Sequence, residues 1–411
     1  MINNFDIRND IQVEMFLPNE YQNTFIIGVS TIGGTDLLSS GGVFTINISL
    51  IGGSDVISDG SVFDWQAIQC ETSRADISTG GTIISALYFQ PEAATCSIEV
   101  QSWAFDPNNS SAVRPGTPMR IRLVRDAYEQ TLFNGFLDTF TVTYRADGPN
   151  LINFQATDSF KRLVNTPVFD YDTTGYPAGY ATPNELIEIA TDAAGMVISV
   201  SSDVLPGKLP LASADTIPAS SLINDSLQVG LGLVWVDAET GELVVKNRPT
   251  SGVTPPLGTL VIGNNHGEAN HLCMSDITSE GDADVIFNSL LVSLTSDPAT
   301  FVSVSDADSV DLYGYNLKDI AINTTDATEL NRWADVVFTQ RPYKLVRSVT
   351  TPAIDRLGTL TEAAAILPGE LVGVQYQTSN INIEDYFTAT KVSHSLDVNN
   401  WFTTLELWKE Y

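Results

Sequence analysis

The pattern of apolar and polar residues over the first 160 residues is that of short β-strands. Apolar side chains alternate with polar ones at residues 11–15, 44–50 and 119–123. A period of two puts every second side chain on the same face of a sheet, so each run predicts a strand with one buried and one solvated face. The glycine pairs that separate such runs, and that we expect to form turns, are Gly33-Gly34, Gly41-Gly42, Gly52-Gly53 and Gly80-Gly81. Many short strands with glycine-rich turns are typical of a β-sandwich or β-barrel.

A β-hairpin is predicted most clearly at residues 133–158. Its second strand, residues 151–157, alternates apolar and polar positions and follows an Asp147-Gly148 pair. Glycine readily adopts the positive φ of a tight hairpin turn, so we expect the turn at this pair. Asp158 comes directly after the strand, where it could cap a helix.

The pattern becomes helical after residue 165. Thr182 is a favourable cap, Pro183 a favourable first residue, and Gly195 a favourable end for one helix. A second helix is predicted at Ser220–Leu227. The apolar face of the first helix is expected to consist of Leu186, Ile189, Ala190 and Ala193.

Strands resume after residue 251, and one further helix interrupts them. Asp326 and Glu329 have the spacing of a capping box, and Pro342 would end the helix. The apolar stripe of this helix, which we expect to pack on a sheet, consists of Leu330, Trp333, Ala334 and Val337.

These patterns predict a mainly β protein with an α/β insert, in which a hairpin turns at Gly241. The expected parts are a first β-barrel domain at residues 1–165, an α/β insert at 166–250, and a second β-barrel domain at 251–411 with a helix near 326–340.

Two distant segments of the chain have the same order of features. Residues 114–157 and residues 367–407 each run from a Pro-Gly pair through a strand, an aromatic-rich strand and an Asp turn to an alternating strand. In this comparison Val142 matches Val392. Chance similarity between two hairpins is the alternative, but the shared order favours two related β-domains.

The net charge narrows the range of partners. Twenty Lys and Arg against fifty Asp and Glu give a charge of −30, spread along the chain. Such a chain repels a phosphate backbone, which argues against stable nucleic-acid binding. The charge could serve solubility alone, or it could belong to a surface past which DNA moves without binding.

Length and cysteine content set further limits. The 411 residues can form two or three domains, and no apolar run approaches the roughly 20 residues of a membrane span. The polar start, MINNFDIRND, predicts no secretory signal. Cys70, Cys96 and Cys273 are an odd number without a CxxC pair, so we expect no disulfide framework and assembly in a reducing cytoplasm.

One glycine-rich segment resembles a phosphate-binding loop. Gly28, Gly33 and Thr35 have Walker spacing, but Gly34 stands where the lysine should be. Without that lysine, and without a helical pattern after it, the segment is better interpreted as a loop between strands.

Two clusters could bind a metal ion. The first consists of His266, His271 and Cys273, with the distant His394 as the only further histidine. The second consists of Asp306, Asp308 and Asp311, but its EF-hand glycine is missing and Leu317 occupies the twelfth position. We interpret the first as a loop with solvated histidines and a buried cysteine, and the second as a solvated acidic loop.

No catalytic signature accompanies these clusters. The chain has three histidines, no HExxH and no GxSxG, so no nucleophile has a base beside it. The sequence therefore predicts no catalytic, cofactor-binding or metal-binding residue, and an enzyme is disfavoured.

Several stretches, taken in order, resemble the hub proteins of bacteriophage tails, which include baseplate hubs of contractile tails and tail-tip hubs of long non-contractile ones. The stretches are residues 95–123, 133–142, 153–163, 332–349 and 392–408. The resemblance implies two tube-protein-like barrels per chain, and a homotrimer whose six barrels continue the hexameric tail tube around the DNA channel. It also implies a place in the virion after assembly in the host cytoplasm.

The resemblance further implies neighbours among the tail tube or distal tail protein, the tape measure protein and tail-tip or fibre proteins. The chain ends at Tyr411, just after the hub-like hairpin, so we expect no fibre or lytic extension. The alternatives are a tail-associated enzyme that degrades surface polysaccharide or peptidoglycan, and a glycan-binding adhesin.

Overall fold

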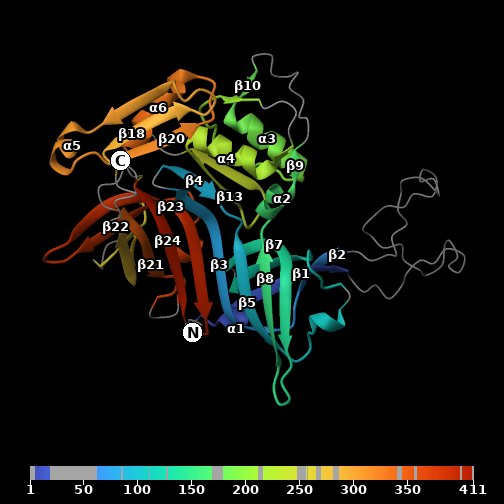
Figure 1. Ribbon diagram of the computed structural model, residues 1–411. Helices are drawn as coiled ribbons and strands as arrows, with labels where there is room; N and C mark the ends of the chain where they lie inside the picture. The colour runs from blue at the N-terminus through green and yellow to red at the C-terminus, as the bar shows by residue number, and fades with distance from the viewer. Residues whose placement is uncertain are drawn as a thin grey trace, which may run out of the picture.

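The computed structural model is mainly β, with a large curled sheet on one side and helices gathered on the other (Figure 1). It describes residues 5–18, 63–84, 87–110, 112–125, 128–168, 179–211, 216–247, 256, 258–264, 270–280, 287–339, 345–355, 359–398 and 400–409. The mainly β class expected from the alternating pattern is confirmed. The runs at 44–50 and the first three glycine pairs lie outside the described residues.

Fifteen strands form one sheet, and all but one of them fall into two groups of seven. The first group is β1 (Ile11–Pro18), β2 (Phe63–Ala67), β3 (Glu71–Ile84), β5 (Thr95–Ser102), β6 (Pro118–Arg125), β7 (Tyr128–Thr143) and β8 (Asn150–Thr157). The second group is β15 (Val261–Gly263), β16 (His271–Cys273), β17 (Asp276–Glu280), β21 (Leu345–Pro352), β22 (Leu371–Gln377), β23 (Asn382–Asp397) and β24 (Trp401–Lys409). We call them the first unit and the second unit.

The two units have the same strand order. In space the first unit runs β3-β5-β8-β7-β6-β1-β2, and the second runs β17-β21-β24-β23-β22-β15-β16. If the seven strands of each unit are numbered along the chain, both units have the spatial order third, fourth, seventh, sixth, fifth, first, second. Short 3-10 helices at Pro107–Asn109 and Glu362–Ala365 also occupy matching places. One difference is that β15 runs parallel to β22, whereas β1 runs antiparallel to β6. The shared order confirms that the two segments noticed in the sequence belong to related units.

The Pro-Gly turns that precede β6 and β22 are the same at the level of single hydrogen bonds. The Gly116 N–H donates to the Leu137 carbonyl at 2.7 Å, and the Gly369 N–H donates to the Ala389 carbonyl at 2.7 Å. Both glycines have positive φ, at 92° and 81°, which explains why glycine stands at both places.

A β-bulge marks the matching point in the long middle strand of each unit. It interrupts the pairing of β7 with β8 after Leu137, and the pairing of β23 with β24 after Ala389. Counting from the bulge, Val392 corresponds to Phe140, because these residues lie opposite Leu405 and Phe154 respectively. The sequence-based match of Val142 with Val392 was therefore wrong by two residues.

Each unit curls until its ends approach each other. In the first unit Ile68, between β2 and β3, donates its N–H to Val13 of β1 at 2.9 Å. In the second unit Met274, between β16 and β17, donates to Gly263 of β15 at 3.0 Å, and Ser275 donates to Thr350 of β21 at 2.7 Å. The paired strands of the described residues do not close into a ring, so each unit is a curled sheet and not the closed barrel expected from the sequence. One hydrophobic core fills both units.

The two units are joined strand to strand. Residues 74–80 of β3 pair antiparallel with residues 391–397 of β23. Beyond this joint β3 pairs with β4 (Tyr88–Pro91) through residues 81–84. The strand changes partners at Gly80, whose φ is +114° and whose added Cβ would lie 2.2 Å from the Thr390 carbonyl oxygen. The turn expected at Gly80-Gly81 was therefore wrong, because this pair lies inside a strand at a close backbone approach.

The described residues 160–247 form an α/β layer, the first insert, against β4. Its elements are α2 (Phe160–Asn165), β9 (Pro167–Val168), β10 (Tyr180–Ala181), α3 (Pro183–Ala194), β11 (Leu209–Pro210), β12 (Ile217–Pro218), α4 (Ala219–Gly230), β13 (Gly232–Val236) and β14 (Leu243–Asn247). Helix α3 begins after its cap Thr182 and ends at Gly195 with φ 64°, as predicted, and Thr182 also forms a capping box with Glu185. Ala193 is exposed, and Ile187 is buried instead, so the buried face is rotated from the predicted one.

The tip of the β13–β14 hairpin contacts both units. Gly241 turns this hairpin with φ 73°, as predicted. Glu239 accepts a hydrogen bond from the Thr131 N–H of β7 at 3.1 Å. A hydrogen bond with the Thr131 side chain, followed by this backbone bond and by the charges of Arg122 and Arg120, lowers the pKa of Glu239, whereas burial acts in the opposite direction. On the other side Trp235 packs against Gly369, where an added Cβ would lie 2.8 Å from the indole ring.

Residues 289–339 form a second layer, the second insert, between β17 and β21. Its elements are β18 (Ser289–Leu294), β19 (Phe301–Ser305), α5 (Ala307–Tyr313), β20 (Leu317–Ile322) and α6 (Ala327–Thr339). The predicted stripe of α6 is confirmed, since all four residues are buried against this three-stranded sheet. Pro342 lies outside the described residues.

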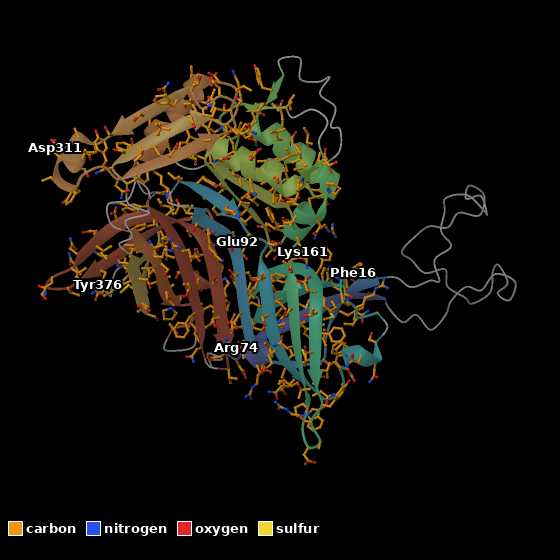
Figure 2. All side chains as sticks on the ribbon, viewed as in Figure 1. Phe16, Arg74, Glu92, Lys161, Asp311 and Tyr376 are labelled. Atoms are coloured by element: carbon orange, nitrogen blue, oxygen red, sulfur yellow. The ribbon has the colours of Figure 1, made fainter. Side chains whose placement is uncertain are left out.

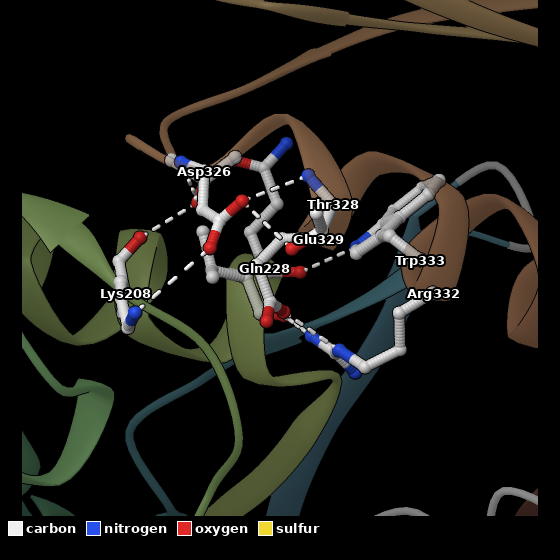
Figure 3. Close-up of polar contacts among 9 residues, drawn as sticks. Lys208, Gln228, Asp326, Thr328, Glu329, Arg332 and Trp333 are labelled. Carbon is white, nitrogen blue, oxygen red and sulfur yellow. Dashed lines mark hydrogen bonds and ion pairs between the residues drawn. The ribbon is translucent and has the colours of Figure 1, made fainter.

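Helix α6 also attaches the second insert to the first (Figure 3). The Trp333 Nε1–H donates to the carbonyl of Gln228 on α4 at 2.7 Å, and Arg332 donates to the carbonyl of Val229 at 2.7 Å. The Glu329 carboxylate pairs with Arg332 at 2.7 Å, while the Asp326 N–H is directed to Thr324. The capping box expected at Asp326 and Glu329 is therefore not formed, because Glu329 is used by Arg332.

The hairpin at residues 133–158 is formed by β7 and β8, but its turn differs from the prediction. Residues 144–149 connect the strands, and Gly148 is not among the glycines with positive φ. A connection of this length does not require the left-handed backbone of a two-residue turn, so the tight turn at Asp147-Gly148 was wrong.

Asp158, which was expected to cap a helix, lies one residue before Ser159, the N-cap of α2, and is buried there. Its carboxylate accepts the Phe160 N–H at 3.0 Å. Burial raises its pKa from 3.8 to about 7, although bonds from the Ala94 and Phe160 backbone favour the charged form. The folded chain therefore holds this proton over a range where the unfolded chain has lost it.

Replacing Asp158 by asparagine should change how stability depends on pH. Because the pKa is raised on folding, the stabilising contribution is complete below pH 4 and is lost as pH rises to about 7, a loss of about 3–4 kcal/mol. In Asp158→Asn the free energy of unfolding should fall less between pH 4 and 7, as measured by urea denaturation. Asp147→Asn, at an exposed position, is the matched control and should follow the wild type. Parallel curves for all three proteins would contradict this assignment.

Candidate functional surface

The outward side of the joined sheet is a continuous polar surface that crosses both units. Its polar residues occupy alternate positions of six strands and lie opposite one another in register, with Phe402, opposite Ser395, as an apolar residue on the same side. We call it the polar face: Arg74, Asp76, Ser78, Thr95, Ser97, Glu99, Thr139, Thr141, Asn153, Gln155, Thr157, Lys391, Ser393, Ser395, Asp397, Thr404 and Glu406. The alternate residues, such as Ile98, Phe154 and Leu405, are buried in the core. Alternation of side chains along each strand, interrupted at the β-bulges, thus produces one apolar and one mainly polar side.

Hydroxyl side chains join the polar face across the boundary between the units. Ser395 donates to Asp76 at 2.7 Å, and the Ser393 and Ser78 hydroxyls lie 3.1 Å apart. A hollow of about 450 Å³ lies over this boundary and is lined by residues of both units. The side chains that line this hollow are short, polar and mostly uncharged. They offer many neutral hydrogen-bonding groups and few charged ones.

The charges of the polar face are mainly negative. The acidic residues are Asp76, Glu99, Asp397 and Glu406, whereas the basic residues are Arg74 and Lys391. Each basic residue is held in an ion pair, Arg74 with Asp76 at 2.9 Å and Lys391 with Glu92 at 2.7 Å. Figure 2 shows Arg74 near one end of this sheet. A surface with its cations paired offers little attraction to a phosphate backbone.

The histidines and cysteine suspected of metal binding are not brought together. His271 and Cys273 lie on β16, where Cys273 is exposed rather than buried, and His394 lies on β23. Two strands, β15 and β22, separate these positions, and no group of three or more metal-binding side chains occurs in the described part of the chain. His266 lies outside the described residues.

His394 is a core residue. The Trp401 Nε1–H donates to its Nδ1 at 3.3 Å, and burial lowers its pKa from 6.5 to about 4. An indole donor at Nδ1 requires a neutral ring with an available lone pair there. His394 therefore packs as a neutral histidine below the polar face.

The acidic cluster expected to be a loop is a helix. Asp306 caps α5 by accepting the Ser309 N–H at 3.1 Å, and Asp308 and Asp311 lie within the helix. The prediction of a loop was wrong because an Asp followed by good helix-capping geometry can begin a short helix. Figure 2 places Asp311 at the outer end of the second insert. The Walker-like residues Gly28, Gly33, Gly34 and Thr35 lie outside the described residues.

Cys70, Cys96 and Cys273 form no disulfide. Burial raises the pKa of Cys70 to about 12 and raises that of Cys96 further. Among the described helices, none has the length and apolar character needed to cross a membrane.

The comparison with solved structures identifies the fold. A tail protein of Neisseria meningitidis MC58 superposes with a TM-score of 0.55 at 14% identity, over 84% of this chain and 94% of that one. The chain has the fold of phage tail proteins. The 43 kDa tail protein of prophage MuSo2 from Shewanella oneidensis gives a TM-score of 0.52 at 12% identity, over 84% of this chain and 95% of its own.

A prophage tail protein, gp18, from Listeria monocytogenes EGD-e has this tail-protein fold as well. It gives a TM-score of 0.51 at 12% identity, over 85% of this chain and 92% of its own. No family model and no curated protein sequence matches the chain. The tail-protein fold is thus evident in the arrangement of strands and not in residue identity, and it agrees with the resemblance found in the sequence.

Proposed function

We propose that this chain is a structural protein of a phage tail, in which three copies form a hub around the passage through which DNA leaves. The observation that carries the proposal is the duplicated seven-strand unit. Three chains with two units each supply six related positions, which match a hexameric tail tube. The fold shared with phage tail proteins supports the same assignment.

In this hub the polar face would line the passage. Its hydroxyl, amide and carboxylate groups would leave a passing duplex mobile, because DNA is held mainly through phosphate contacts that release counterions. The two basic residues of the face are already paired with carboxylates. The charge of −30 would therefore have a local purpose at this wall, in addition to keeping the outer surface soluble.

The division of labour within the chain follows from the same proposal. The first unit, within residues 1–165, and the second unit, within residues 251–411, would supply the ring, and the first and second inserts would lie outside it. The neighbours would be the tail tube or distal tail protein on one side and the tape measure and tip or fibre proteins on the other. The protein would assemble in the host cytoplasm and reside in the virion, and it would act without catalysis.

Mass and imaging of the purified chain test this function. Sedimentation should give a species of three chains, and negative-stain images should show a ring with a central opening. A monomer at all concentrations that also degrades cell-wall or capsule preparations would support the enzyme instead. Saturable glycan binding by a monomer would support an adhesin.

A further inference from the structure

Two units are joined inside one chain by the pairing of two strands. The two strands that occupy the equivalent positions in the opposite units are not paired with each other in the described residues. In the joint, β3 of the first unit pairs with residues 391–397 of β23 in the second unit. The strands of equal rank are β17, which matches β3, and β7, which matches β23. Among the described residues, β17 pairs only with β21, and residues 137–143 of β7 pair only with β8.

Both open edges are accessible and lie on opposite flanks of the joined sheet. Asp276, Thr278, Thr141 and Thr143 are all exposed. In the sheet, β24, β23, β3, β5 and β8 lie between β7 and β21, the partner of β17, and Figure 1 shows β21 and β7 on either side of these strands. The two edges therefore face away from each other. An exposed strand edge carries unpaired backbone donors and acceptors that can pair with another chain.

We propose that β17 of one copy pairs antiparallel with the outer edge of β7 in the next copy, which repeats between chains the joint formed within each chain. This inference rests on the proposed hub and names its contact surface. Such a contact is heterologous, because two different edges meet, and heterologous contacts generate rings when the rotation closes.

The register follows from the matched positions. Counting from the bulges, Ser395 corresponds to Thr143. Asp76 lies opposite Ser97, which lies opposite Gln155, and Thr278 lies opposite Ser348, which lies opposite Glu406. Because Gln155 and Glu406 follow the matched residues Phe154 and Leu405, Asp76 corresponds to Thr278. Since Ser395 lies opposite Asp76 in the existing joint, Thr143 should lie opposite Thr278 in the new one.

Two positions further along, the new joint brings opposite charges together. In the existing joint Asp397 lies opposite Arg74. The corresponding residues are Arg145 in the first unit and Asp276 in the second, both exposed. Arg145 and Asp276 again carry opposite charges, but the base now stands at the position of the acid Asp397, and the acid at the position of the base Arg74. Chance placement would as readily have opposed like charges. Opposite charges facing each other across strands stabilise the pairing.

Cysteine cross-linking tests the proposed register. In a Cys273→Ser background, Thr143→Cys combined with Thr278→Cys should form disulfides between chains under mild oxidation, giving linked dimers and trimers on non-reducing gels. The control Thr139→Cys with Thr278→Cys is four residues out of register, and it should cross-link about tenfold less because bridged Cα atoms must lie within about 7 Å. Asp76→Cys with Ser395→Cys should cross-link within one chain and leave its mass unchanged.

Charge reversal gives a second test. Arg145→Asp and Asp276→Arg should each weaken self-association about fivefold, and the double variant should restore it. Association without the Thr143–Thr278 cross-link, or a double variant no better than the singles, would overturn this interface but leave the hub. A chain that neither associates nor cross-links would overturn both.

Discussion

Replacing Trp333 by alanine should lower the free energy of unfolding by about 3–5 kcal/mol. The indole is fully buried between the three-stranded sheet of the second insert and helix α4. Its removal leaves a cavity, and it also leaves the Gln228 carbonyl without the 2.7 Å bond that it accepts from Nε1. Urea denaturation followed by circular dichroism measures the effect.

Two further variants separate the causes. Trp333→Phe keeps most of the ring but loses the N–H, so it should cost less than the alanine variant. Phe301→Ala, on β19 of the same layer, removes a ring that is 55% exposed and should change stability by about 0.5 kcal/mol or less. If Trp333→Ala unfolds at the same urea concentration as Phe301→Ala, the packing described for α6 is wrong.

Replacing Gly80 by alanine should destabilise the fold by about 3–5 kcal/mol, because two costs add. The first is backbone strain at φ +114°, and the second is a Cβ placed 2.2 Å from the Thr390 carbonyl oxygen. The clash is with backbone of the neighbouring strand and can be relieved only by separating β3 from β23. The joint between the two units should therefore weaken.

Gly116→Ala provides the matched control. Gly116 also has positive φ, at +92°, but nothing lies within 4 Å of an added Cβ. This variant should show the strain alone, about 1–2 kcal/mol. Equal losses in the two variants, measured by denaturation, would mean that the contact at Thr390 contributes nothing.

Elements with a local signature could be predicted from the sequence. Helix α3 was predicted because its cap, its first proline and its final glycine all lie between Thr182 and Gly195. Helix α6 was predicted because its apolar stripe has the helical period. The strand order was accessible only in part. The Pro-Gly turns identified a repeat, whereas β15 and β16 have three residues each and show no alternation that could be counted.

What could not be predicted depends on contacts between distant residues. Gly80-Gly81 is locally indistinguishable from a turn, and only the approach of Thr390 explains it. The polar face is similar, because single strands show which residues point outward but not which strands are neighbours. Serines such as Ser97 and Ser393 become one surface only after β5, β3 and β23 are placed side by side.

The covalent fusion of two units has a consequence for the kinetics of assembly. In the proposed ring, six separate units would need five productive encounters, whereas three fused chains would need two. Each encounter costs roughly 4–15 kcal/mol of translational and rotational freedom, so fusion removes the largest entropic obstacle from three of the five steps. The β3–β23 joint is already closed within each chain. In the proposed ring, each chain would therefore arrive as a finished third of the circle, with the edge of β17 and the edge of β7 still to be paired.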